Sequence, residues 1–255
     1  MPPLSFLRSL LVTDPLVVLA TVIMGSISVA CSFFDPGGRR QHAVSRVWAK
    51  LLLAISRVKV RFQGAERLDP KASYVFAGNH LSFMDTPVVL AHIEQQFIFL
   101  VNAKYVRLPF LGTHLRRSGH FAVDPEDAKA SLRIMSEAAK RLRERGLSVL
   151  LFPEGSRARD EMKEFKEGAA VIAIKAGVPV VPFAVMGTRQ VLPVGSIHIR
   201  AGSVDLLLGE PIPTAHLTLK DRGMLTQQMR ERVVDLLARL EDRARMETAA
   251  LGSGR

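Results

Sequence analysis

Two short stretches of this 255-residue chain carry side chains whose types and spacing suit chemistry. Residues 79–85 (NHLSFMD) place a histidine and an aspartate five positions apart, directly after an apolar run. Residues 152–157 (FPEGSR) place an acid, a glycine and an arginine after a second apolar run. A base with an orienting acid, together with a cationic anchor, is what moving an acyl group onto a hydroxyl beside a phosphate requires.

His80 and Asp85 are the candidate base and its orienting acid. A neutral imidazole, whose reference pKa is about 6.5, can take a proton from a hydroxyl near neutral pH. A carboxylate on the other ring nitrogen fixes the tautomer and stabilises the imidazolium that forms. Two simpler interpretations stay open. Ser82 and Asp85 have the spacing of a helix capping box, and His80 also suits an ordinary polar loop.

The stretch 152–157 is a candidate anion site. Main-chain N–H groups after a strand can converge on an anion together with the guanidinium of Arg157. Gly155 allows the backbone to approach a ligand closely. The alternative is a surface turn with solvated charges, for which Pro-Glu-Gly-Ser is also suited. Because both stretches follow apolar runs, about 70 residues apart, we interpret them as parts of one site.

The elements that must position these residues are alternating strands and helices. Strands are expected at 73–78, 96–101, 147–152 and 178–185, and helices at 85–93, 127–145, 164–176 and 222–245. Apolar strands between helices predict an α/β fold with a mainly parallel sheet flanked by helices. Such sheets place sites at the carboxyl ends of their strands, where both stretches lie. We also expect a hairpin over 197–208 at the sheet edge and a frayed tail from Ala249 to Arg255.

Before this domain comes a segment of 20 residues without a charge, Pro15–Phe34. As a helix it would extend about 30 Å, the thickness of the hydrocarbon core of a bilayer, and it predicts an N-terminal membrane-associated helical element. Gly25, Ser26 and Ser28 weaken it, so a re-entrant or half-buried helix stays open beside a spanning one. A buried core helix is the further alternative. The nearly neutral flank argues against a signal peptide.

Residues 36–61 carry seven Lys or Arg and no Asp or Glu, with apolar side chains at helical spacing. A basic amphipathic helix containing Trp48 fits the lipid interface, and an ordinary helix packed on the domain core fits equally well. The net charge of +11 indicates an anionic partner. We expect a membrane lipid bilayer and no nucleic acid, because only two Tyr and one Trp are available for base stacking. The basic flank places the remaining chain on the cytoplasmic side.

The chain is therefore divided into membrane-anchoring helices over 1–60, one α/β domain over 61–248 and a tail over 249–255. A single cysteine, Cys31, excludes an internal disulfide. No His/Cys cluster has the spacing of metal ligands, so we expect neither a metal nor a cofactor.

Together these motifs resemble those of the 1-acyl-sn-glycerol-3-phosphate (lysophosphatidic acid) acyltransferase family of the glycerolipid acyltransferase superfamily. The first block of that family, with its catalytic histidine and aspartate, matches residues 79–85. Its Phe-Pro-Glu-Gly-Thr/Ser-Arg block matches 152–157, followed by Phe-Lys-x-Gly at 165–168 and Val-Pro-x-x-Pro at 178–182. The resemblance runs from about Arg61 to Gly209.

One block departs from the family pattern. Lys104, Pro109 and Gly112 fit the stretch that precedes the second block, but that block usually ends Ile-Asp-Arg and here Asp124 is followed by Pro125. In the family this arginine is implicated in holding the acceptor phosphate, so the exact acceptor lysolipid is left open. The cations available to replace it are Lys104, Arg107, Arg116 and Arg117. His120 in this block is expected to be structural.

The resemblance implies a membrane-bound enzyme of the cytoplasmic face of the cell membrane, as in the bacterial inner membrane. It would move a fatty acyl group from acyl-CoA or acyl carrier protein to the sn-2 hydroxyl of lysophosphatidic acid, giving phosphatidic acid for phospholipid biosynthesis. His80 would take the hydroxyl proton, Asp85 would orient His80, and backbone N–H groups near Gly155 would stabilise the oxyanion.

The expected substrate-binding residues are Glu154, Gly155, Ser156, Arg157, Lys104 and Lys166, with Glu154 and Arg157 on the glycerol phosphate. Two alternatives stay open. In the first, the acceptor would be another lysolipid or glycerol 3-phosphate. In the second, the chain would be a membrane module that binds anionic lipid without catalysing a reaction.

Overall fold

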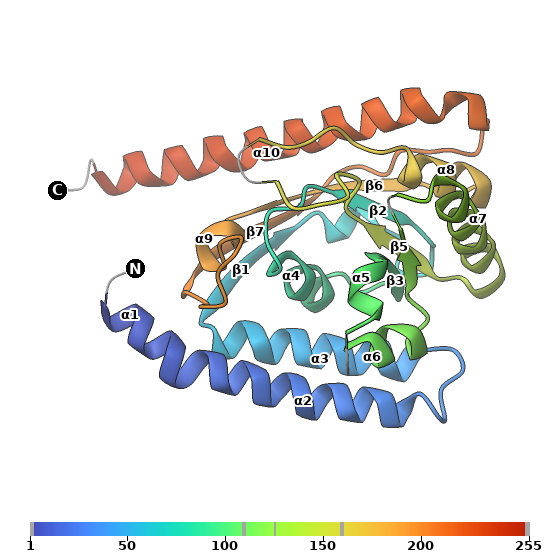
Figure 1. Ribbon diagram of the computed structural model, residues 1–255. Helices are drawn as coiled ribbons and strands as arrows, with labels where there is room; N and C mark the ends of the chain where they lie inside the picture. The colour runs from blue at the N-terminus through green and yellow to red at the C-terminus, as the bar shows by residue number, and fades with distance from the viewer. Residues whose placement is uncertain (1–2, 109–110, 125, 159–160, 253–255) are drawn as a thin grey trace.

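A computed structural model describes residues 3–108, 111–124, 126–158 and 161–252, and its centre is a seven-stranded sheet. The strand order is β1-β7-β6-β2-β5-β3-β4 (Figure 1). Every neighbouring pair is parallel except β6 with β7, so the expected mainly parallel sheet is confirmed. The strands are β1 Val58–Gln63, β2 Val75–Gly78, β3 Phe97–Asn102, β4 Phe121–Val123, β5 Ser148–Leu151, β6 Val180–Met186 and β7 Gly202–Leu208.

Helices cover both faces of this sheet (Figure 1). Alternate side chains of β2 enter opposite cores. Phe76 packs with α3 and α4, whereas Val75 and Ala77 pack with α7, α8 and α10. The helices are α1 Pro3–Arg8, α2 Asp14–Cys31, α3 Arg39–Ile55, α4 Asp85–His92, α5 Ala103–Val106, α6 Leu111–Arg117, α7 Ala128–Arg145, α8 Gly168–Ala176, α9 Thr188–Val191 and α10 Arg222–Gly252. Ser9–Thr13 is a π-helical segment, and Ala65–Arg67 and Leu219–Asp221 are 3₁₀ turns.

Local sequence accounts for the central elements. All four residues of β5 are buried, as expected for a strand covered on both faces. Gly146 and Gly177 end α7 and α8 with φ angles of 63° and 68°, a backbone conformation that glycine adopts without strain. The helix expected from residue 164 begins only at Gly168, because the N–H of Lys166 donates to the carbonyl of Pro153 instead.

The expected hairpin over 197–208 is wrong. Among the described residues, 197–200 form no strand, and β7 pairs in parallel with β1 and antiparallel with β6. The 197–200 segment instead contacts the N-terminal helix, since His198 Nδ1 lies 2.8 Å from a carboxylate oxygen of Asp14. The basic helix that we expected over residues 36–61 ends at Ile55, and the edge strand β1 takes its last residues. The predicted domain boundary after residue 60 therefore falls inside β1.

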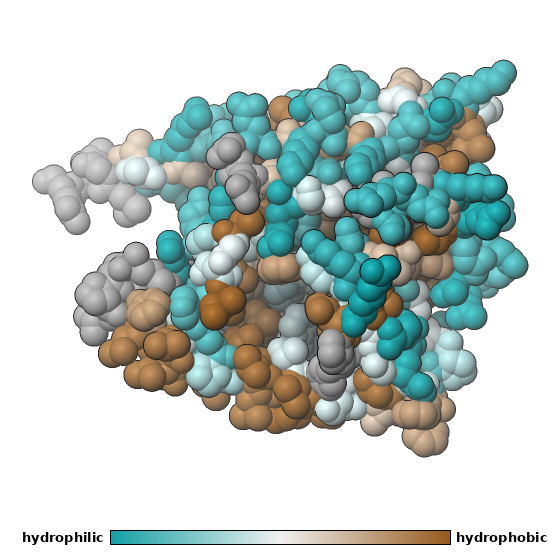
Figure 2. Space-filling model, viewed as in Figure 1, coloured by the Kyte–Doolittle hydropathy of each residue, from teal (hydrophilic) through white to brown (hydrophobic). Residues whose placement is uncertain are grey.

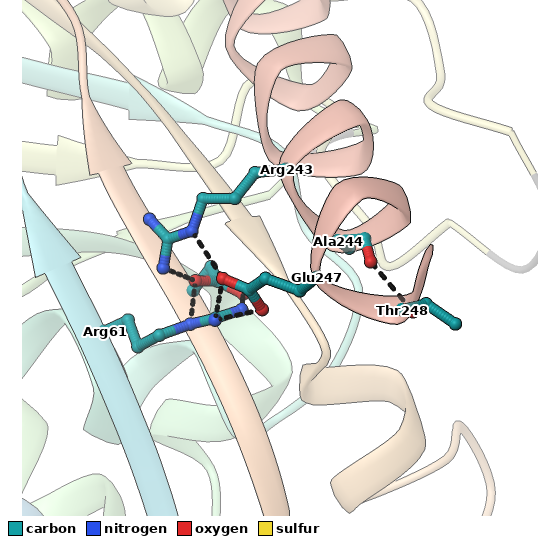
Figure 3. Close-up of polar contacts among 6 residues, drawn as sticks. Arg61, Arg243, Ala244, Glu247 and Thr248 are labelled. Atoms are coloured by element: carbon teal, nitrogen blue, oxygen red, sulfur yellow. Dashed lines mark hydrogen bonds and ion pairs between the residues drawn. The ribbon is translucent and has the colours of Figure 1, made fainter. Parts of the chain in front are cut away.

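The C-terminal helix α10 runs seven residues beyond Arg245, to Gly252, so the frayed tail predicted from Ala249 is wrong for residues 249–252. Residues 253–255 lie outside the described part of the chain. Figure 3 shows what holds this end of the helix. Arg61 of β1 bridges buried Asp205 of β7, at 2.7 Å, and Glu247 of α10, at 2.6 Å. Arg243 also reaches Asp205, at 3.4 Å.

The first two helices, α1 and α2, with the π-helical segment between them, form a layer along one side of the molecule, at the bottom of Figure 1. We call it the N-terminal layer. Phe6–Cys31 is continuous helix of 26 residues with a mean hydropathy of 2.1, long and apolar enough to cross a membrane. Its apolar side chains are largely exposed, for example Leu11 at 63% and Val18 at 62%. The alternative of a buried core helix is therefore wrong.

Helix α3 lies between this layer and the sheet. Ala49, Leu52 and Leu53 are buried in the core shared with α4, and the indole N–H of Trp48 donates to Thr21 of α2 over 3.0 Å. Of the two interpretations of this basic helix, packing on the domain core is the one that the structure shows. Val47 and Leu51 remain exposed on its outer side.

Candidate active site

The two sequence stretches meet at the carboxyl edge of the sheet. Strands β2 and β5 are parallel neighbours, so the loops that follow them lie side by side. His80 follows β2 and Phe152 follows β5, and their rings stack with centroids 4.1 Å apart and planes 12° from parallel. The expected convergence of the two stretches is therefore present in the structure.

His80 and Asp85 form a hydrogen-bonded pair, with Nδ1 of the imidazole 2.8 Å from Oδ2 of the carboxylate. Asp85 is fully buried and the side chain of His80 is 17% exposed. Because an ionised carboxylate only accepts hydrogen bonds, Nδ1 carries the proton of this bond and Nε2 keeps the lone pair. That tautomer is the one that a general base requires.

The same carboxylate also shapes the loop. Oδ2 of Asp85 accepts the main-chain N–H groups of Leu81 and Ser82 over 2.7 and 2.9 Å. The capping-box interpretation is half correct, because the hydroxyl of Ser82 bonds the N–H of Met84 rather than that of Asp85. Asp85 thus holds both the imidazole and the backbone that carries it.

Asn79 fixes the start of this loop. Its side-chain amide donates to the carbonyl of Val185 over 2.9 Å and accepts the Val185 N–H over 2.8 Å. The side chain thereby extends the β2–β6 ladder by one rung beyond Gly78. Sequence reasoning recognised Asn79 as part of the motif but gave it no role.

Glu154 joins the two loops. Its carboxylate is buried and accepts the main-chain N–H of His80 over 2.7 Å and that of Lys163 over 2.9 Å. Burial raises the pKa of Glu154, and these two hydrogen bonds oppose that shift. The geometry gives Glu154 a positioning role, and its contact with glycerol phosphate stays a prediction.

The rest of the second stretch faces the open side of the site. Gly155 has φ 71°, and its N–H donates to the carbonyl of Phe152, so this N–H is engaged in a turn. The Ser156 hydroxyl accepts a hydrogen bond from Nζ of Lys163 over 2.7 Å. The guanidinium of Arg157 lies over the ring of Phe83, 3.6 Å from its centroid.

A cavity of about 1460 Å³ opens in front of these groups. It is lined by His80, Gly155, Ser156, Arg157, Lys104 and Lys166, whereas Asp85 and Glu154 lie behind this surface. Figure 2 shows the hollow between the hydrophobic lower edge of the molecule and its hydrophilic upper right.

Cations dominate the charged lining of this cavity. Lys104, Arg157, Lys166, Lys175 and Arg222 contribute five positive charges, against Glu167 as the one acid among the described lining residues.

Of the cations that we considered as replacements in the second block, Lys104 lines the cavity. Arg116 instead donates to the carbonyl of Val106 over 2.7 Å, and Arg117 stacks on Phe33 of the N-terminal segment. Arg107 is exposed and does not line the cavity. Pro109 and Pro125 lie outside the described residues.

Two histidines that sequence reasoning missed, His42 and His114, line the cavity together with His120. Burial is the main cause that lowers their pKa values, to about 4 for His42 and about 3 for His120. Nδ1 of His120 accepts the N–H of Phe99 over 3.0 Å, which supports the structural role expected for it. His42 and His114 lie far apart in the sequence, so no local pattern marks them as partners.

Comparison with known proteins agrees with this geometry. The model of the acyltransferase family matches residues 59–186, which contain both stretches. The chain is 33% identical, over 82% of its length, to a 1-acyl-sn-glycerol-3-phosphate acyltransferase of Chlamydomonas reinhardtii, of which it spans 61%. For a chloroplastic relative of the same name from Arabidopsis thaliana the identity is 32%, over 70% of this chain and 51% of the relative.

A bacterial relative is matched over more of its length. The chain is 26% identical, over 78% of its length, to the 1-acyl-sn-glycerol-3-phosphate acyltransferase of Borreliella burgdorferi, of which it spans 80%. The fold is also that of a solved structure. The crystal structure of the 1-acyl-sn-glycerophosphate acyltransferase PlsC from Thermotoga maritima superposes with a TM-score of 0.76 at 24% identity, covering 93% of this chain and 98% of that one.

Proposed function

Because the chain belongs to the acyltransferase family, we propose that it transfers a fatty acyl group from a thioester to the sn-2 hydroxyl of 1-acyl-glycerol-3-phosphate, giving phosphatidic acid. The single observation that carries this proposal is the His80–Asp85 pair at the wall of a large cavity with a cationic lining. The names of the relatives in algae, plants and bacteria support the choice of acceptor.

The pair supplies the proton transfers of the reaction. Nε2 of His80 removes the hydroxyl proton as that oxygen attacks the thioester carbon, and Asp85 stabilises the imidazolium. When the tetrahedral intermediate collapses, the C–S bond breaks and the imidazolium returns the proton to the departing thiolate. His80 is then neutral again, so no acyl-enzyme is needed.

The oxyanion of that intermediate needs N–H donors close to the base. The N–H of Gly155 is engaged by Phe152, so we assign this role to the next main-chain groups, Ser156 and Arg157. Among the described residues neither of these two N–H groups has a hydrogen-bond partner. They follow directly on the loop whose Phe152 ring stacks on His80.

The acceptor phosphate is assigned to Arg157, with Lys104 as the second cation. Both line the cavity, and the guanidinium of Arg157 stacks on the ring of Phe83, with its Cζ atom 3.6 Å from the ring centroid. A planar guanidinium suits bidentate binding of a phosphate, and stacking on a ring preorganises it. We expect lysophosphatidic acid to be preferred over glycerol 3-phosphate, because the cavity wall also includes apolar residues such as Leu90, Leu100 and Leu115.

The apolar part of the cavity wall fits a fatty acyl chain, which lysophosphatidic acid carries and glycerol 3-phosphate lacks. Leu90, Leu100 and Leu115 belong to this part of the wall. Burying methylene groups there contributes about 0.8 kcal/mol for each group removed from water. The acceptor with a chain should therefore bind more tightly than the one without it.

The N-terminal layer associates with a membrane, and we propose that α2 lies along the cytoplasmic surface of the bilayer rather than across it. Three contacts tie it to the rest of the protein along its length: Asp14 to His198, Thr21 to Trp48 and Ser28 to His114. A spanning helix would have to give up all of these contacts. The exposed apolar side of the layer can then enter the headgroup and acyl boundary while the site stays at the interface.

Acyl transfer by the purified full-length protein tests the proposed function. Lysophosphatidic acid, a second lysolipid and glycerol 3-phosphate are each mixed with radiolabelled acyl-CoA, and we expect phosphatidic acid to form fastest. His80→Ala should lower the rate by at least the roughly 10²–10⁴-fold that general base catalysis contributes. Asp85→Asn should lower it by the same amount or less, because Asp85 acts through His80. A folded His80→Ala protein within tenfold of the wild-type rate would exclude this mechanism.

A further inference from the structure

The cavity does not end at the catalytic pair but continues over the carboxyl edge of the sheet to its other face. There it is lined by Leu132 and Met135 of α7, Val171 and Lys175 of α8, Leu219 of the 3₁₀ turn before α10, and Arg222, the first residue of α10. We call these six residues the donor groove. We propose that the donor groove binds the phosphopantetheine arm of the acyl donor, an inference that rests on the proposed function.

The position of the groove separates it from the membrane. The exposed apolar helices α1 and α2 lie on the α3 side of the sheet, whereas α7, α8 and α10 cover the other side (Figure 1). A lipid acceptor reaches His80 from the membrane side. A water-soluble donor has to approach from the side that faces water, and the groove leads from there to the same histidine.

The lining of the groove matches the chemistry of that arm. Phosphopantetheine is a chain of amides and methylene groups with a phosphate at one end and the thioester at the other. Met135 and Val171 supply an apolar floor, and Leu132 and Leu219 are 55% and 40% exposed beside it. Lys175 and Arg222 supply positive charge for the phosphate.

Both cations are held in place but remain accessible. Nζ of Lys175 donates to the hydroxyl of Ser136 over 2.7 Å, which uses one of its three protons. Arg222 pairs with Glu167 at 2.8 Å and is 47% exposed. Lys166, which contacts the position where a Cβ of Gly155 would lie, continues the cationic lining toward the catalytic pair.

The experiment compares three donors that carry the same acyl group on the full-length enzyme. Acyl-CoA and acyl carrier protein both contain phosphopantetheine, whereas the acyl thioester of N-acetylcysteamine has no phosphate. In the double variant Lys175→Gln/Arg222→Gln we expect the KM for the first two donors to rise about tenfold, as for the loss of a charge-assisted hydrogen bond to phosphate. The KM for the N-acetylcysteamine thioester and the KM for lysophosphatidic acid should not change.

Two further variants serve as controls. Lys140→Gln removes a charge from α7 at a position that does not line the cavity, and it should leave every KM unchanged. Lys175→Arg keeps the charge and should retain most of the donor affinity. Thermal unfolding of each variant checks that the fold is intact.

Three results would overturn the proposal. One is an unchanged donor KM in the folded double variant, and another is an equal rise with the N-acetylcysteamine thioester. The third is a rise with only one of the two large donors, because the contact would then be with the adenosine phosphates or with the carrier protein rather than with the shared arm.

The donor groove and the proposed function can fail separately. If the wild type transfers no acyl group from any donor, the proposed function fails. The donor groove can then still be tested, because calorimetric titration compares the affinity of the wild type and of the double variant for coenzyme A. If the wild type is active and the double variant matches it, the donor groove alone is wrong.

Discussion

The ring of Phe152 lies nearly parallel to the imidazole of His80, with centroids 4.1 Å apart. Phe152 comes from the loop after β5 and His80 from the loop after β2, so the contact joins two segments that are 72 positions apart in the printed sequence. The stack restricts rotation of the imidazole while Asp85 holds Nδ1. The direction of the basic Nε2 atom is thus set by one contact from each loop.

Phe152→Leu should lower kcat while leaving both KM values close to those of the wild type. Leucine keeps the apolar character but loses the stacking, which is worth about 0.5–1.5 kcal/mol and corresponds to roughly a two- to tenfold effect on the rate. Steady-state kinetics with both substrates measures it. Phe62→Leu is the matched control, because Phe62 contacts His92 away from the site. A rise in KM at constant kcat would show that Phe152 binds substrate instead of orienting His80.

Arg157→Ala should raise the KM for lysophosphatidic acid about ten- to a hundredfold, as for the loss of a hydrogen bond between charged groups. The KM for the thioester should change little, because an interaction made equally in ground and transition states affects the binding of its own substrate. Arg157→Lys keeps the charge without the planar fork and should lie between the two. Arg107→Ala removes an exposed cation outside the cavity and serves as control. A selective rise in the donor KM would mean that the two substrate sites are exchanged.

Acid should destabilise the protein through His42 and His120. Burial lowers their folded-state pKa values to about 4 and about 3, below the value near 6.5 of an unfolded chain. Below pH 6.5 the unfolded state therefore binds more protons. The stability that these residues contribute is fully present above pH 6.5 and decreases as the pH falls toward 4 and 3. At pH 5 the loss is on the order of 2 kcal/mol for each histidine.

His120→Asn should reduce this sensitivity to acid, since the asparagine oxygen can still accept the N–H of Phe99. Denaturant unfolding in detergent at pH 7 and pH 5 measures the difference for the variant and the wild type. The exposed His216 provides a matched control, His216→Asn. If His120→Asn loses as much stability between the two pH values as the wild type, the histidine is not buried in its neutral form.

Membrane binding should depend on the exposed apolar side chains of the N-terminal layer. We expect the full-length protein to remain on anionic vesicles in high salt, and Leu11→Glu/Val18→Glu to bind only at low salt. The seven cations of residues 36–61 then act alone, and salt screens them. Vesicle flotation at two ionic strengths measures this, with Val234→Glu on α10 as the exposed control. Release of the full-length protein by salt alone would contradict the proposed insertion of α2.

The hydrogen-bonded pair of His80 and Asp85 was predictable because its geometry is local. His80 and Asp85 are five positions apart at the point where a buried strand meets a helix, and backbone geometry alone brings their side chains together. The sheet was predictable for a related reason, since strands such as β5 are apolar throughout.

The rest depends on contacts between distant segments. The carboxylate of Glu154 receives the N–H of His80, and no pattern near residue 154 indicates such a partner. The edge strand β1 was missed because its apolar residues continue the spacing of the preceding helix. Arg57, with φ 55°, breaks that helix in a conformation that is uncommon for arginine and that sequence patterns do not reveal.

The pairing of β1 with β7 sets the order of events during synthesis of the chain. The apolar helices and β1 leave the ribosome before β7 does. Arg61 cannot contact Asp205, and β1 cannot pair with β7, until 144 further residues have been synthesised. At about 5–20 residues per second this interval lasts roughly 7 to 30 seconds. During that time the exposed apolar segment has no folded domain to rest against. The exposed apolar side chains of Phe6–Cys31 are therefore made well before the sheet can be completed, and lipid or a chaperone is what would cover them in that interval.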